Sequence, residues 1–198
     1  MSLETIKVRI AMVQEKVTIA DAKNSPIFDN VNEANDEEPN LSKAKDDKAF
    51  EKLKSDILAN LLVAEKSVKP WQKAMDEWAA AVKELETDAG TEKAKIEQQQ
   101  READLLSKQM DDMNAQIQEY NDGLLLGEAD PRYRPLFFKK DTSTKLKSAM
   151  EAVNAALAVA KDANRVWKLR NESVPAAISD IKNIKDRVSK MKFKKPAK

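Results

Sequence analysis

The stretch Trp71–Ile96, WQKAMDEWAAAVKELETDAGTEKAKI, places its apolar residues alternately three and four positions apart. Such spacing sets them on one stripe of an α-helix, and a sustained repeat is typical of coiled-coil helices. The same phase holds without a break over about sixty residues, which predicts one long rod-like helix. The stripe positions are Ala64, Val68, Trp71, Met75, Trp78, Val82, Leu85, Ala89, Glu92, Ile96, Gln99, Ala103, Leu106, Met110, Met113, Ile117 and Tyr120.

We expect this helix to occupy residues 42–122, with a kink or break at Pro70 or Gly90. The Asn-Asp-Gly sequence at 121–123 is a usual stop signal for a helix. A second apolar stripe, from Leu146 to Val188, predicts a return helix over residues 142–190 that can bend at Pro175.

The N-terminal segment carries a third apolar stripe, from Leu3 to Ala20, which predicts a helix over residues 1–23. Residues 24–41 lose this periodicity and are rich in acidic residues and asparagine. We interpret them as an acidic connector between helices, most simply a solvated one.

These elements predict an all-α fold in which two long helices form an antiparallel coiled-coil hairpin. The N-terminal helix is expected to pack near the base of the hairpin, making a three- to four-helix bundle with the tryptophans in its core. A symmetric register about the loop places Pro175 opposite Gly90. This register predicts a weak mid-hairpin hinge, unless the polar positions only fix the register. The hinge residues are Gly90, Glu92, Gln99, Asn164, Asn171 and Pro175.

Residues 123–141 form the expected tip loop, and GLLLGEADPRYRPLFFKK (123–140) gathers apolar side chains among turn residues. Three interpretations stay open: a self-packed cap, a protein-binding tip, or a tip that touches a membrane surface. The candidate partner-binding residues are Leu125, Leu126, Arg132, Tyr133, Arg134, Leu136, Phe137 and Phe138. Leu58, Leu62 and Leu105 lie off the main stripes and would be covered in a homo-oligomer.

The near-neutral total charge of +1 hides opposite charges at two places in the chain. Residues 24–47 are acidic, whereas the C-terminal region ends in a basic tail, residues 191–198. This tail could bind phosphates or anionic lipid, pair with the acidic segment, or stay solvated. Phe193 is its one aromatic residue, so nucleic acid is not an expected partner. The basic tail residues considered are Lys190, Lys192, Lys194, Lys195 and Lys198.

The chain has no cysteine, no histidine and only three glycines. Thiolate metal sites, serine triads and glycine-rich phosphate loops therefore cannot be built, and we expect no cofactor, no metal and no enzymatic activity. The sequence also has no signal peptide and no apolar run long enough to cross a membrane, which favours a cytoplasmic protein but leaves signal-independent export open. The expected function is protein–protein interaction by a scaffold, adaptor or assembly subunit. The alternative is a membrane-active helical protein, such as a pore-forming toxin subunit or a membrane-curving rod.

Overall fold

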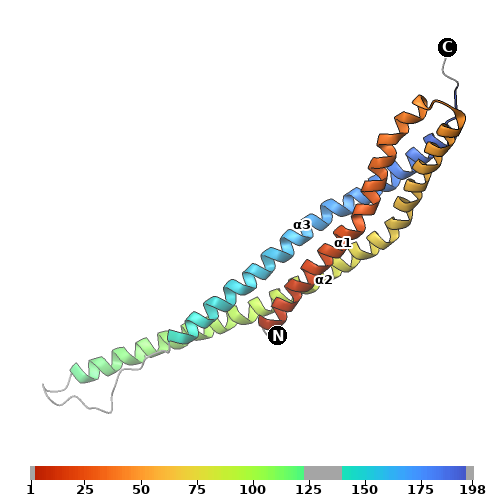
Figure 1. Ribbon diagram of the computed structural model, residues 1–198. Helices are drawn as coiled ribbons and strands as arrows, with labels where there is room; N and C mark the ends of the chain where they lie inside the picture. Colours follow the sequence, from red (N-terminus) through yellow and green to blue (C-terminus); the bar gives the residue numbers. More distant parts are fainter. Residues whose placement is uncertain (1–2, 123–139, 195–198) are drawn as a thin grey trace. The chain divides into compact units, whose positions relative to one another are not determined.

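The computed structural model describes residues 3–122 and 140–194, and helices occupy nearly all of them. The elements are α1 (Leu3–Glu37), a short 3-10 helix η1 (Glu38–Lys43), α2 (Asp47–Asp122) and α3 (Lys140–Lys190) (Figure 1). The described residues contain no strand. The prediction of an all-α fold built on two long helices, with a third helix packed against them, is confirmed.

The N-terminal helix is longer than expected, because α1 continues through Pro26 to Glu37. The prediction of a helix over residues 1–23 followed by a connector over 24–41 is therefore wrong. Ile27, Val31 and Ala34 lie at helical spacing and are buried, so this polar segment still has an apolar face. Its high content of asparagine and acidic residues conceals that face in the sequence.

The long helix α2 begins at Asp47, a few residues later than expected. Asp46 supplies an N-cap, because its Oδ1 accepts a hydrogen bond of 2.7 Å from the Ala49 N–H. The helix is continuous through Pro70 and Gly90 and ends at Asp122, as the heptad phase predicts. The return helix α3 likewise agrees with the expected 142–190 to within two residues at its start.

The chain divides into two compact units, and α2 contributes to both. Unit 1 comprises residues 1–7 and 86–158, and unit 2 comprises residues 8–85 and 159–198. In unit 2, α1, α2 and α3 form a three-helix bundle. Its core is built on Trp71 and Trp78, which both have 0% of their surface exposed, as the sequence predicts. The edge of the Phe28 ring meets Trp71, with ring centroids 6.1 Å apart.

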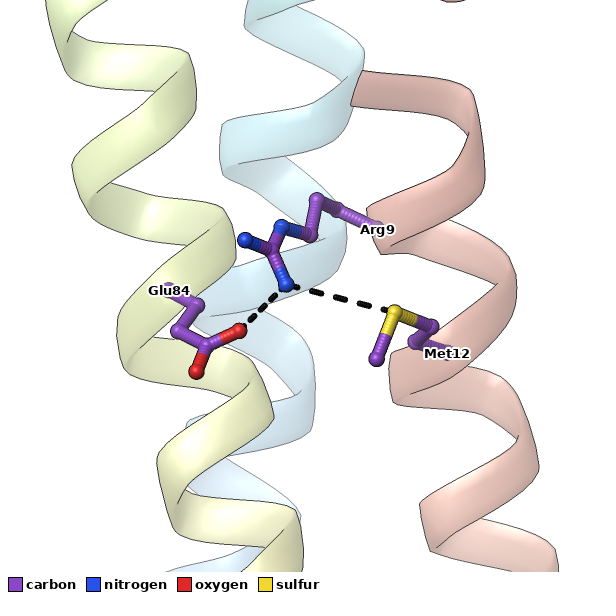
Figure 2. A network of polar contacts seen from close by, with 3 residues as sticks. All are labelled: Arg9, Met12 and Glu84. Carbon is purple, nitrogen blue, oxygen red and sulfur yellow. Dashed lines mark hydrogen bonds and ion pairs between the residues drawn. The ribbon is translucent and has the colours of Figure 1, made fainter. Parts of the chain in front are cut away.

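Polar contacts at the surface of unit 2 bind α1 to α2. Arg9 of α1 donates a hydrogen bond to Glu84 of α2 and lies 4.0 Å from the Met12 sulfur (Figure 2). Lys16 donates to Glu77 at 2.8 Å; this hydrogen bond raises the pKa of the lysine and lowers the pKa of the carboxyl. From the first pair to the second, the residue number rises along α1 from 9 to 16 and falls along α2 from 84 to 77. The two helices are therefore antiparallel.

The register between α2 and α3 in unit 2 differs from the predicted one. The Trp167 indole N–H donates to the Met75 carbonyl at 2.8 Å, and Lys185 donates to Glu65 at 2.7 Å. These contacts place Pro175 level with Pro70. The predicted register was symmetric about the loop, and it is wrong by about three heptads, a shift that leaves the phase of an apolar seam unchanged.

The predicted hinge rested on Gly90 facing Pro175, and the register in unit 2 places Pro175 level with Pro70 instead; bending at the predicted hinge residues stays a prediction. Gly90, Glu92 and Gln99 lie in unit 1, whereas Asn164, Asn171 and Pro175 lie in unit 2. Glu92 is half-buried beside Lys95 at 3.6 Å, and Gln99 is exposed. The pairing of Gly90 with Pro175 followed from the wrong register.

The three internal prolines of the helices share one level of unit 2. Each described α-helix has a single internal proline: Pro26, Pro70 or Pro175. Pro26 and Pro70 line the same groove, and Pro175 lies level with Pro70. The Asp21–Arg170 ion pair has the same offset between α1 and α3 as the Pro26–Pro175 pair, so these two prolines are also level. α2 changes direction near this level (Figure 1).

Candidate interaction surface

The expected partner-binding residues of the tip, Leu125 to Phe138, lie outside the described residues. The structure does describe the helix that leads to them. The candidate surface lies on the last turns of α2, within unit 1.

In unit 1, α2 extends further than the helix that packs against it. Ile96 and Gln100 of α2 line a groove of about 410 Å³ with Leu146 and Met150 of α3. Continuing this antiparallel pairing places the start of α3, at Lys140, about level with Leu106. The turns of α2 beyond that level have no helix opposite them in the described part of the chain.

These last turns carry the apolar stripe onward and leave it exposed. We call residues Leu106, Met110, Met113, Ile117 and Tyr120 the α2 end stripe. Leu106, Met113 and Tyr120 are 53%, 50% and 47% exposed, and the neighbouring Leu105 is 58% exposed. Met110 and Ile117 are half-buried. The heptad phase predicts these five as buried seam positions, which is wrong because α3 begins too late to cover them.

The side chains on both sides of the α2 end stripe carry no charge. Ser107 and Asn114 lie one position after stripe residues, and Gln109 and Gln116 lie one position before them. These are the e and g positions of the heptad, where charged residues normally select the partner helix. Acidic side chains occur instead on the outer face, at Asp104, Asp111, Asp112 and Glu119.

The described part of the basic tail packs against the start of α2. The Lys54 ammonium donates to the carbonyls of Ser189 and Met191 at 3.1 and 2.9 Å. Phe193 packs on Phe50, with ring centroids 6.0 Å apart. Lys190, Lys192 and Lys194 are exposed, and Lys195 and Lys198 lie outside the described residues.

One contact joins the acidic segment to the basic C-terminal region. The Arg187 guanidinium donates two hydrogen bonds to the Glu38 carboxylate, at 2.8 and 2.6 Å. Hydrogen bonding to Arg187 lowers the pKa of Glu38 below its ordinary value of 4.5. This bidentate pair fastens η1 to the last turns of α3. Arg187 lies in α3, before the tail at 191–198, so the pairing of the acidic segment with the tail itself stays a prediction.

The Glu38–Arg187 pair makes part of the stability of unit 2 depend on pH. Because the folded-state pKa of Glu38 is lowered, its contribution is present above about pH 4.5 and is lost as pH falls through the folded value. Glu38→Gln should therefore lower the urea midpoint slightly at about pH 7, and by less at about pH 3, because protonation of Glu38 weakens the pair as the pH falls below about 4.5. Urea unfolding followed by tryptophan fluorescence measures this. Glu33→Gln on exposed α1 surface is the control, and an equal effect of Glu38→Gln at both pH values would contradict the assignment.

The other surfaces of the described residues show fewer features of a site. In unit 2 a groove of about 560 Å³ between α2 and α3 has an apolar floor that includes Val68 and Ile181. Leu62 is exposed and Leu58 half-buried. Among the described residues no three His, Cys, Asp or Glu side chains gather as a metal site would require. None of the described helices has a stretch both long and apolar enough to traverse a bilayer.

Comparisons with known proteins give no relative. The chain matches no protein family model, no curated protein and no solved structure.

Proposed function

We propose that this protein is a non-enzymatic helical assembly subunit that binds another protein chain through the α2 end stripe. The observation that carries the proposal is the exposure of Leu106, Met113 and Tyr120 beyond the start of α3. Apolar side chains clustered on a protein surface usually mark a site of interaction. Their heptad spacing suits an incoming helix, which would lay its own apolar face along the stripe.

The position of the stripe supports a docking role over a purely structural one. In the neighbouring part of unit 1 the same face of α2 is covered by α3, at Ile96 and Ala103. A partner helix laid on the stripe would continue this packing with side chains already in the correct phase. The stripe also leads directly into residues 123–138, whose apolar and aromatic content favours an interaction site.

The proposal predicts that charge on the stripe abolishes partner capture. The double variant Leu106→Glu plus Met113→Glu should retain less than about a tenth of the protein captured by wild type, because buried unpaired carboxylates are costly. Pull-down from the native source, quantified against bait, measures this. The matched control is Ala94→Glu plus Ala115→Glu, which adds the same charge at exposed positions on the outer face.

Two results would contradict the proposal. One is equal capture by wild type and by the stripe variant. The other is wild-type flotation with liposomes, retained by the stripe variant and lost when residues 124–138 are replaced by a Gly/Ser linker. That second result would assign the function to the tip and a membrane surface.

A further inference from the structure

We propose that the partner of the α2 end stripe is a second copy of this chain, paired antiparallel about a two-fold axis near Met113. This inference rests on the proposed function, since it names the partner of the same surface. It is carried by three observations in unit 1: the uncharged flanks of the stripe, the level at which α3 begins, and the spacing of the stripe residues.

The flanks favour an identical partner. Serine hydroxyls and glutamine amides both donate and accept hydrogen bonds, so Ser107, Gln109 and Gln116 can pair with their counterparts in a second copy. A two-fold interface brings a surface patch onto itself, so charged flanks of one sign would repel. Here Ser107, Gln109, Asn114 and Gln116 avoid that repulsion, while the acidic residues lie on the outer face.

The start of α3 selects the antiparallel arrangement. On the N-terminal side of Leu106, α3 occupies the same face of α2. The N-terminal part of α2 in a parallel copy would therefore collide with α3. An antiparallel copy runs in the same direction as α3 and ends where α3 begins. It therefore extends the two-helix pair of unit 1 without displacing any described helix.

The stripe is nearly symmetric about Met113, because Leu106 and Tyr120 lie seven positions to either side and Met110 and Ile117 lie three before and four after. A two-fold axis at Met113 brings Leu106 opposite Tyr120 of the second copy, and Met110 within one position of Ile117. Each stripe residue then lies next to an apolar side chain of the second copy. The paired segment is about 22 Å long, which is a small interface, so we expect a reversible dimer with a micromolar Kd.

Single-cysteine variants test the arrangement, since the natural chain has no cysteine. Under a mild thiol–disulfide buffer, Met113→Cys should form a covalent dimer in most of the protein, because the two sulfurs meet at the axis. Leu106→Cys should not, because the antiparallel copies hold its two positions about 21 Å apart. Ala115→Cys, on the outer face, is the background control, and non-reducing gels with intact mass measure all three.

Light scattering over a concentration series completes the test. Wild type should dimerise, and Leu106→Glu plus Met113→Glu should raise the Kd at least tenfold without loss of helicity.

Cross-linking of Leu106→Cys as efficiently as Met113→Cys would overturn the antiparallel arrangement. A wild type that stays monomeric, with Met113→Cys at background, would overturn the second copy as partner. If the wild type is monomeric but captures a partner that the Glu variant does not capture, the proposed function stands and only this inference fails. A monomer whose melting temperature falls in the Glu variant would place the chain's own residues on the stripe and would also overturn it.

Discussion

Replacing Trp71 by alanine is expected to lower the free energy of unfolding of unit 2 by about 4 kcal/mol. The side chain is fully buried, and the Phe28 ring packs edge-on against it. Removing a buried indole loses its transfer free energy and leaves a cavity that rigid helices fill only in part. Urea unfolding followed by circular dichroism measures the loss.

The variant Trp71→Phe tests whether the stability loss comes from the lost side-chain volume or from a lost hydrogen bond. The Trp71 Nε1–H has no acceptor in the described part of the chain, so Trp71→Phe removes no hydrogen bond. We expect it to cost less than about 1.5 kcal/mol, since an aromatic ring still fills the site. Tyr120→Ala, in unit 1, is the control and should leave the unfolding of unit 2 unchanged. A Trp71→Ala loss below about 1.5 kcal/mol would remove Trp71 from the core of the bundle.

The long helices and the burial of Trp71 and Trp78 follow from the heptad pattern alone. An apolar stripe sustained over many turns specifies both the helix and the face that it buries. The same regularity hides the register, because a slip by whole heptads returns every seam residue to an equivalent position. Only specific contacts, such as the Trp167 N–H to the Met75 carbonyl, distinguish one register from another.

The exposure of the α2 end stripe is hard to predict from the sequence, because the regular repeat also hides where the covering helix begins. Leu106, Met113 and Tyr120 continue the seam without any change of pattern, so nothing local signals that α3 starts too late to cover them. The nearest signal was the late start of the second stripe, at Leu146. The extent of α1 was missed for a different reason: local polarity and Pro26 argue against a helix that tertiary packing of Ile27 stabilises.

The alignment of the prolines in unit 2 leads to the second large effect. Each of Pro26, Pro70 and Pro175 lacks the N–H that would bond the carbonyl four residues earlier, and a proline inside a helix costs about 3 kcal/mol. Alanine recovers that cost, less about 1 kcal/mol from the greater entropy of the unfolded chain. The triple variant should therefore be more stable than wild type by roughly 6 kcal/mol.

Single replacements should recover much less, because the three prolines share one level. A bundle bent there by two remaining prolines prevents the third helix from straightening, so Pro70→Ala alone should gain no more than about 1 kcal/mol. The sum of the three single gains should thus fall well short of the triple gain. Lys69→Ala, beside Pro70, is the control and should stay within about 0.5 kcal/mol of wild type.

Urea unfolding followed by tryptophan fluorescence measures these gains selectively, because Trp71, Trp78 and Trp167 all belong to unit 2. Single gains that add up to the triple gain would show that each proline acts only on its own helix. No gain in any variant would mean that the bundle is bent by its packing and that straight helices do not fit its core. Strong coupling between the three sites is the outcome that a shared bend requires, since neighbouring sites in one packed level seldom contribute independently.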